Sequence, residues 1–418
     1  FSHFLAETIL CLSIPVILVA DLFARTPERR NQVAGSLGLL ALLAAFFVAI
    51  TQPASSGATL TPLLRADGLG KVFRILAIGT GVLAAVAAHR QRDLERARTE
   101  FFVLIIVAVA GACFTAASNN LAMLYLSVET LSIGGYLLAG FKKDDPKGSE
   151  AALKYVIFGA VSSGAMLYGM SLLYGFAGTA TIATPPGETY ASIQAAAGSA
   201  AASPGFLVAI VMVFAGLAYK VAVVPFQFWC PDVYQGAPTS VAAFLAVASK
   251  GAGFAALVRI VAGVTGSGTD QIGEALALNN ENVRLVLLGV AVITMTFANL
   301  TALRQQDSKR LLAYSAIAHA GVLLRGVAVT GHLALTSIIF YMVVYLFMTL
   351  GAFYLVGVVE RETGRTDIDA FEGLGFKAPV LGATMTIFLL SLTGIPPTGG
   401  FVGKLFIFKE VFAFAGAN

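Results

Sequence analysis

The sequence predicts an all-α fold, a polytopic bundle of transmembrane helices, and three observations support that class. Hydrophobic residues make up 57% of the 418-residue chain and charged residues only 12%, whereas soluble domains carry about 25% charged residues. The mean hydropathy is +0.83. Apolar runs recur along the whole chain, and most approach the length of about 20 residues that a helix needs to cross a bilayer. These observations exclude a soluble globular protein.

Two further features exclude other functions. The net charge of +4 comes from basic residues spread over several connections, so we expect no nucleic-acid partner. The three cysteines, Cys11, Cys113 and Cys230, lie far apart without a CxxC pair, which argues against an iron–sulfur cluster, a zinc site or a disulfide framework. We therefore expect no metal and no redox cofactor in this chain, and the lipid bilayer as its surroundings.

The apolar runs predict twelve membrane crossings. The last run is too long for one simple span, and Pro396 and Pro397 interrupt it, so the twelfth helix is expected to be broken. The runs cover residues 4–22, 33–50, 70–88, 101–117, 121–141, 152–177, 205–225, 238–264, 284–303, 311–330, 333–358 and 379–415.

Lysine and arginine gather in alternate connections between these runs. They follow the first, third, fifth, ninth and eleventh runs, whereas the connections at 178–204 and 265–283 contain neither residue. Connections on the cytoplasmic side of a membrane are enriched in these two residues. The N-terminus is therefore expected on the periplasmic side of a bacterial inner membrane.

Four charged residues lie inside apolar runs on four different predicted helices: Glu129, Lys220, Lys250 and Lys404. An ionisable group at mid-bilayer costs about 2.5–3.5 kcal/mol on insertion scales, so such residues are functional candidates by default. Four of them together indicate a hydrophilic path for protons or ions through the membrane interior. For the glutamate, a structural buried ion pair is the alternative interpretation.

Prolines accompany two of the lysines. Pro225 follows Lys220 by five residues and lacks an N–H, so it should break or kink the seventh helix. Lys404 instead follows the pair Pro396 and Pro397. Broken helices recur at transporter ion sites, and an inverted repeat would place lysine and proline in opposite order in its two halves. Burial also weakens the hold of a lysine on its proton, which a relay requires.

Lys154 and His319 are secondary candidates. Lys154 lies only a few residues inside the sixth helix, so a side chain that reaches the interface is nearly as good an interpretation as a relay group. Histidine is the side chain best suited to proton exchange near neutral pH. A lone histidine in a helix bundle is nevertheless more often a structural hydrogen-bonding residue.

Three longer stretches resemble one family. Residues 226–239 read FQFWCPDVYQGAPT, residues 307–321 read DSKRLLAYSAIAHAG, and residues 393–404 read TGIPPTGGFVGK. These motifs resemble the antiporter-like membrane subunits of respiratory complex I, the proton-translocating NADH:quinone oxidoreductase. The first motif resembles the N-type members rather than their L- or M-type relatives. The resemblance extends over most of the chain and is weakest in the first three helices.

The resemblance implies a membrane-arm subunit that relays protons, driven by quinone reduction in partner subunits. It implies three N-terminal helices in 1–100 and two inverted five-helix repeats in 101–264 and 284–418, with helices 7 and 12 broken. NADH, FMN, iron–sulfur clusters and quinone would be bound by partner subunits, since this chain lacks their motifs. Its neighbours would be M-type and small K-type membrane subunits.

The resemblance also implies roles for single residues. Glu129 matches a helix 5 glutamate that pairs with Lys220. Lys250 matches a central lysine, Lys404 a terminal lysine toward one exit, and Lys154 a further lysine of helix 6. These matches agree with the charges that the apolar runs single out.

Two departures from the family pattern stand out. The family normally has fourteen helices, so the resemblance implies an incomplete second repeat here. Arg325 stands in helix 10 where an apolar residue is expected.

Three other functions compete with the relay. The first is a subunit of a multi-subunit cation/proton antiporter with the same fold, and the motif at residues 226–239 argues against it. The second is an inert spacer, against which the four intramembrane charges argue. The third is a quinone-reducing enzyme, for which the chain lacks a redox motif.

Overall fold

The computed structural model describes residues 2–24, 26–53, 58–89, 97–142, 144–184, 190–200, 203–265, 281–328 and 334–415. Its elements are η1 (Ser2–Phe4), α1 (Leu5–Phe23), α2 (Pro27–Thr51), β1 (Ala58–Thr61), β2 (Leu64–Ala66), α3 (Gly68–His89), α4 (Arg98–Ala117), α5 (Leu121–Ala139), α6 (Pro146–Ala177), α7 (Ile193–Ala200), α8 (Pro204–Val221), α9 (Trp229–Gly236), α10 (Thr239–Phe244), the π-helical turn η3 (Leu245–Ser249), α11 (Lys250–Thr265), α12 (Glu281–Ala302), α13 (Ser308–Ala328), α14 (Ala334–Thr363), η4 (Ile368–Phe371), α15 (Leu374–Lys377), α16 (Pro379–Thr393) and α17 (Gly399–Ala415).

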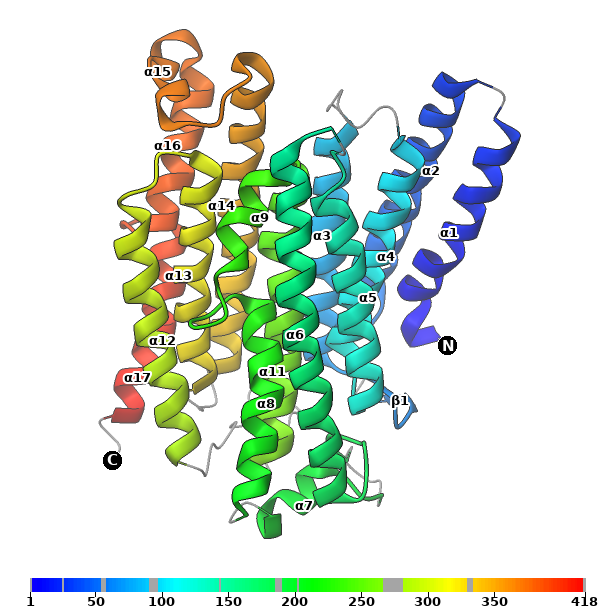
Figure 1. Ribbon diagram of the computed structural model, residues 1–418, viewed down its shortest axis with the longest axis vertical. Coiled ribbons are helices and arrows are strands. Elements are labelled where there is room, and N and C mark those ends of the chain that lie inside the picture. Colours follow the sequence, from blue (N-terminus) through cyan, green and yellow to red (C-terminus); the bar gives the residue numbers. More distant parts are fainter. Residues whose placement is uncertain are drawn as a thin grey trace.

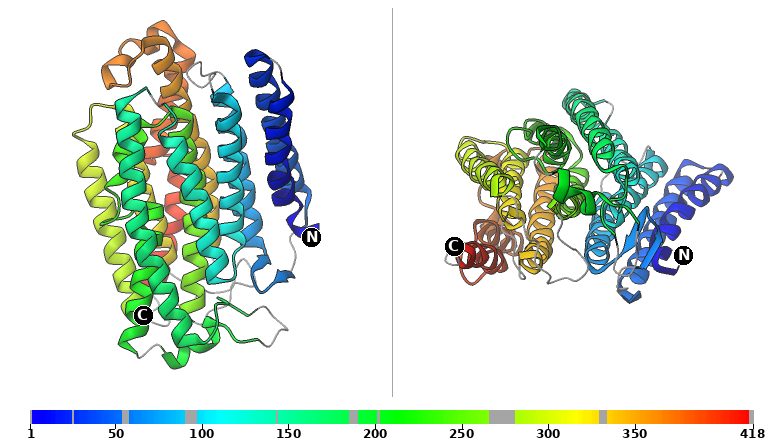
Figure 2. Two further views of the ribbon diagram at one scale, coloured as in Figure 1. Left: turned by 45° about the vertical axis from the view of Figure 1, so that its right-hand side comes forward. Right: turned by 90° about the horizontal axis from the view of Figure 1, so that it is seen from below.

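The long helices run side by side as one bundle, which confirms the predicted all-α transmembrane class (Figure 1). Seen along the bundle, α1 and α2 lie at one edge and α17 at the opposite edge (Figure 2). The short helix α15 lies at one end of the bundle and α7 at the other, and these are called the α15 end and the α7 end below. A small antiparallel hairpin of β1 and β2 is the one sheet in the described residues.

Within the described ranges, eleven segments are long and apolar enough to cross a membrane, and they coincide with the first eleven predicted runs. The innermost is Thr239–Val264, which is buried over its whole apolar window, whereas Leu5–Phe23 is buried over only 22% of it. A helix that is apolar all round and enclosed by others forms the core of a bundle. The segment that carries Lys250 is therefore the centre of this fold.

Two helices stop within the bundle. α8 ends at Val221, where Ala222 takes a left-handed conformation with φ of 60°, and α9 begins only at Trp229. α16 ends at Thr393, Gly394 is left-handed with φ of 83°, and α17 begins at Gly399. Pro225 lies in the first interruption, and Pro396 and Pro397 in the second.

The groups released by the first interruption are satisfied by neighbouring elements. The Val223 amide donates to the Ala218 carbonyl at 3.0 Å, and the Val224 amide donates to Thr294 Oγ1 at 3.1 Å. The Trp229 indole donates to the Tyr219 carbonyl at 3.0 Å. Irregular backbone at membrane depth is tolerated only with such partners. The interruption is thus a stable part of the fold that opens helix ends inside the bundle.

Candidate functional site

Lys220 lies in the last turn of α8, with only 1% of its surface exposed. Its Nζ donates a hydrogen bond of 2.9 Å to Ser132 Oγ on α5. Gly253 of α11 lets this helix approach, since an added Cβ there would lie 2.8 Å from Val221 Cγ1 and 3.3 Å from Lys220 Cγ. The end of α8, α5 and α11 therefore meet around one buried lysine.

Glu129 lies on α5, one turn from Ser132, and is partly buried. Its carboxylate accepts a hydrogen bond from the Ser163 hydroxyl of α6. The described contacts include no ion pair between Glu129 and Lys220, although the glutamate lies within electrostatic reach of the lysine. Each of the two groups thus bonds a different serine hydroxyl, and the described residues show no direct salt bridge between them.

Lys250 is the first residue of α11, directly after the π-helical turn η3, and is 2% exposed. Short π-helical segments inside α-helices are frequently found at functional sites. The lysine Nζ makes no hydrogen bond with any described residue, and it faces the ring of Tyr234, 5.9 Å from the centroid. A buried ammonium without a partner is rare because its desolvation is not offset.

A cluster of aromatic rings includes Tyr219, which precedes Lys220 in α8, and Tyr234, whose ring faces Lys250. Tyr155 stacks on Trp229 with ring centroids 4.5 Å apart, and Trp229 meets the edge of Tyr234 at 6.2 Å. The Tyr219 ring lies 5.2 Å from Trp229. The short helix α9, which supplies Trp229 and Tyr234, thereby contacts both Tyr219 of α8 and Lys250 of α11.

His319 of α13 is 3% exposed and lies between the tyrosines of α14. Its Nδ1 is 2.5 Å from the Tyr341 hydroxyl, and its ring centroid is 5.4 Å from that of Tyr345. The charges of both Lys250 and Lys404 reach His319. The histidine is therefore a buried group that joins α13 to α14, within electrostatic reach of the central and the terminal lysine.

Lys404 of α17 binds the open end of α16. Its Nζ donates to the carbonyls of Leu392 at 2.9 Å and Thr393 at 3.0 Å, two groups left without helical partners at a C-terminus. Gly394 is required for this approach, because an added Cβ would lie 3.2 Å from that Nζ and the residue is left-handed. The positive charge also complements the negative end of the helix dipole.

Lys154 does not lie with these groups. It ion-pairs with Glu150 at 2.7 Å and with Asp232 at 2.5 Å, and 37% of its side chain is exposed. Asp232, on α9, also binds Arg310 of α13 at 2.5 Å. The lysine thus belongs to an ion network at the α15 end that joins α6, α9 and α13.

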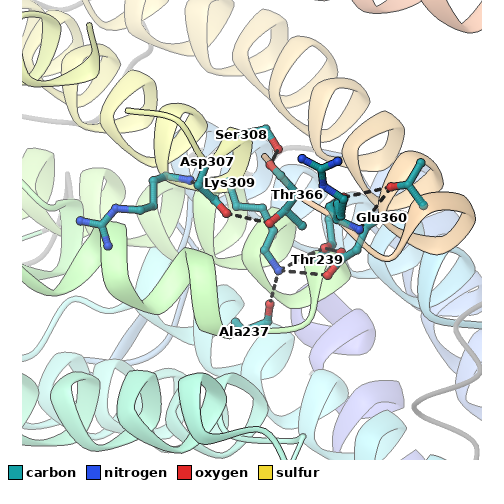
Figure 3. Close-up of polar contacts among 10 residues, drawn as sticks. Ala237, Thr239, Asp307, Ser308, Lys309, Glu360 and Thr366 are labelled. Carbon is teal, nitrogen blue, oxygen red and sulfur yellow. Dashed lines mark hydrogen bonds and ion pairs between the residues drawn. The ribbon is translucent and has the colours of Figure 1, made fainter. Parts of the chain in front are cut away.

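A second contact set at the same end holds the connection between α9 and α10 (Figure 3). Lys309 Nζ donates to the Ala237 carbonyl at 3.0 Å and lies 3.5 Å from a Glu360 carboxylate oxygen. The Thr239 hydroxyl donates to the other oxygen of Glu360. Together with the contacts of Asp232, these bonds tie α9 to α6, α13 and α14. We call the two sets the α9 clamp.

Reasoning from the sequence missed several of these groups. Asp232 and Arg310 lie within the longer family motifs and were not singled out as candidates. A carboxylate in a short apolar helix could have indicated a buried ion pair. Buried pairs elsewhere were missed as well: Glu7 with Arg74 at 2.6 Å, and Asp67 with Arg259 at 2.8 Å. Their positions near helix ends resemble those of exposed residues, and only the packing shows their burial.

Arg325 is 8% exposed and stacks on Phe408 of α17, with the guanidinium carbon 3.4 Å from the ring centroid. Its Nε and one terminal nitrogen make no hydrogen bond with described residues. The ring contact accounts for how an arginine is accommodated where an apolar residue was expected.

Comparison with known proteins gives a consistent picture. Residues 118–417 match the family described as NADH:quinone oxidoreductase/Mrp antiporter, transmembrane region. NADH-quinone oxidoreductase subunit N of Anaeromyxobacter sp. strain Fw109-5 is 41% identical over 412 residues, which cover 98% of this chain and 80% of that protein.

Among solved structures, a chain of respiratory complex I from Thermus thermophilus with bound aureothin is 30% identical, with a TM-score of 0.78 over 97% of this chain and 82% of that one. A chain of the Mrp complex from Dietzia sp. DQ12-45-1b has a TM-score of 0.81 over 99% of this chain and 75% of its own. At 20% identity, the latter shows a shared fold alone.

Proposed function

Because the chain belongs to the NADH:quinone oxidoreductase/Mrp antiporter transmembrane family, we propose that it is a membrane-arm subunit of a NADH:quinone oxidoreductase that relays protons. The observation that carries the proposal is Lys250, whose buried Nζ has no hydrogen-bonding partner among the described residues. A structural lysine is normally paired, since an unpaired buried charge is costly. A lysine that accepts and releases a proton has a reason to lack a fixed partner.

The proposed relay has two parts that meet at α11. Glu129 acts on Lys220 through its charge, and Ser132 positions the ammonium. Lys250 exchanges protons with the Lys220 side through the region around α9, and with His319 on its other side. Lys404 forms the terminal group, close to the carbonyls of α16. Lys154 acts as a positioning residue through Asp232, since it lies in the α9 clamp.

Two interrupted helices support the proposed inverted repeats. We assign residues 1–100 to three N-terminal helices, 101–264 to the first five-helix repeat and 284–418 to the second. Lys220 comes before its interruption and Lys404 comes after its own. Pro225, Pro396 and Pro397 would maintain these interruptions, since none has an N–H to continue a helix.

The surroundings of the chain follow from the same proposal. NADH, FMN, iron–sulfur clusters and quinone would be bound by partner subunits, and neighbours would be the M-type and small K-type membrane subunits. The described residues contain no group of three potential metal ligands. The distribution of lysine and arginine favours a bacterial inner membrane location with the α15 end in the cytoplasm and the N-terminus facing the periplasm.

The test is Lys250→Ala in the assembled enzyme. We expect proton pumping in membrane vesicles to fall about a hundredfold, the scale of removing a proton-transfer group, with the amount of assembled complex unchanged. Lys377→Ala, which removes an exposed lysine, serves as the matched control. Normal pumping by assembled Lys250→Ala complex would overturn the relay. Cation/proton exchange in the same vesicles without NADH would favour the antiporter alternative instead.

A further inference from the structure

A groove of about 580 Å³ lies at the α15 end between α3, α10, α14 and α16. Its walls are mostly apolar and come from the last turns of α3, the second half of α14 and the first turns of α16. Side chains that line it include Leu83, Val86, Ala87, Ala243, Phe347 and Phe388. Leu83 is 44% exposed and Phe347 64% exposed, so the groove opens to the outside of the bundle.

One end of the groove is charged. Arg361, in the last turn of α14, is the one charged residue among the described residues that line it. Its Nε and one Nη donate to the neighbouring carboxylate of Glu362, and 48% of its side chain is exposed. The other Nη makes no bond with a described residue. The groove thus has a long apolar part and an end lined by one cation, which pairs with a carboxylate just outside the lining.

A whole membrane-spanning helix is too large to fit inside the groove. A membrane-spanning helix about 30 Å long and 10–12 Å wide occupies on the order of 2,000–3,000 Å³, several times the volume of the groove. A volume of 580 Å³ instead falls in the range of about 300–1,000 Å³ that is typical of small-molecule sites. Since the walls belong to membrane-spanning helices, lipids are available at the opening.

We propose that this groove is a phospholipid site, with one acyl chain along its apolar walls, the phosphate on Arg361 and a primary ammonium headgroup near Glu362. Arginine binds phosphate by charge-assisted hydrogen bonds, and Arg361 retains a donor for this purpose. The adjacent carboxylate leaves the end of the groove with no net charge. A zwitterionic headgroup of the phosphatidylethanolamine type is therefore a better match than an anionic one.

The site borders the α9 clamp. Thr239 and Ser240 line the groove, and the Thr239 hydroxyl donates to Glu360, which pairs with Lys309 (Figure 3). A lipid in the groove would contact α10 and α14 at the residues that these bonds join. Binding of the lipid does not depend on the proposed relay, and it is measured below without any activity assay.

The test measures phospholipid retained by the purified, detergent-washed complex, by mass spectrometry, and rebinding of acyl-chain spin-labelled phosphatidylethanolamine or phosphatidylglycerol. Two variants change the site: Arg361→Gln removes the cation, and Ala87→Phe fills the groove. Their matched controls are Arg365→Gln, since Arg365 lies outside the groove and pairs with Asp367, and Ala160→Phe, on the exposed side of α6.

We expect the wild-type complex and both controls to retain phosphatidylethanolamine, and to bind it several times more tightly than phosphatidylglycerol. Arg361→Gln should weaken binding about tenfold, the scale of one charge-assisted hydrogen bond, and Ala87→Phe should abolish it. Equal binding by all assembled variants would overturn the site, and a preference for phosphatidylglycerol would overturn the headgroup assignment.

A second measurement does not depend on the stability of the Arg361→Gln and Ala87→Phe variants. A photo-crosslinking residue in place of Val86, which is 43% exposed at the groove, should attach to phospholipid in the intact complex. Attachment to a polypeptide in its place would show that a neighbouring subunit covers the groove, and would overturn the proposal.

Discussion

Lys250 in the bundle interior and Lys309 at the α15 end are buried to nearly the same degree, with 2% and 4% of their surface exposed. Their Nζ atoms nevertheless have different surroundings. Lys309 binds the Ala237 carbonyl and faces Glu360 at 3.5 Å, whereas Lys250 faces the Tyr234 ring and makes no hydrogen bond with described residues. Burial alone therefore does not distinguish a structural cation from a candidate relay group.

The difference lies in partners. A buried cation with a carboxylate and a carbonyl beside it gains specificity and holds elements in register. A buried cation without such partners holds nothing in place, so its charge must serve another purpose. On this criterion we expect the α9 clamp to be structural and the interior groups around α11 to form the proposed relay. Four sets of variants test this division.

The largest effect is expected for Lys220→Ala. Lys220 has one hydrogen-bonding partner, Ser132, and in the proposed relay it must change its protonation state. Proton pumping by vesicles that contain the assembled enzyme should fall about a hundredfold, with coupled quinone reduction falling as well. Pumping at the wild-type rate would show that Lys220 is a structural residue and not a relay group.

The second set of variants tests whether Glu129 and Lys220 act as one unit. Glu129→Gln removes the charge at constant size and should lower pumping about tenfold or more, whereas Glu129→Asp should keep part of the activity. Adding Lys220→Ala to Glu129→Gln should cost little beyond the larger single effect, because coupled groups are not additive. The measurement is the pumping rate per assembled complex, and strictly additive losses would separate the two residues.

Lys404 has hydrogen-bonding partners, as Lys309 does, and is also a proposed relay group, as Lys250 is. Its variants should therefore give an intermediate effect on pumping. Lys404→Gln retains donors for the Leu392 and Thr393 carbonyls but has no charge to transfer. We expect assembly to stay normal and pumping to fall several-fold, while Lys404→Leu should also reduce assembly because it leaves those carbonyls unpaired. If Lys404→Gln pumps normally, Lys404 is a helix cap and not a relay group.

The smallest effect on pumping is expected for Asp232→Asn in the α9 clamp. This change weakens two ion pairs whose side chains are about a third exposed, so the loss of stability should be about 1 kcal/mol. Thermal unfolding of the assembled complex should occur at a slightly lower temperature, and pumping per complex should stay near the wild-type rate. Loss of pumping without loss of stability would show that Asp232 is part of the relay.

The periodicity and composition of the sequence determined the fold class and the first eleven spans, because a helix that crosses a bilayer needs a long apolar run and this requirement is local. The same requirement made Glu129, Lys220, Lys250 and Lys404 visible, since a charge is conspicuous inside an apolar run. The motifs at residues 226–239, 307–321 and 393–404 indicated the family, which the comparisons confirmed.

Only the tertiary structure decided which charges have partners. Lys154 pairs with Asp232, 78 residues away along the chain, and Lys309 pairs with Glu360 across α13 and α14. Glu129 and Lys220 each bond a different serine hydroxyl, with no ion pair between them among the described contacts. Such pairings depend on how helices from distant parts of the sequence pack, to within a few ångströms. Charge–charge attraction changes over that distance, and no local pattern encodes it.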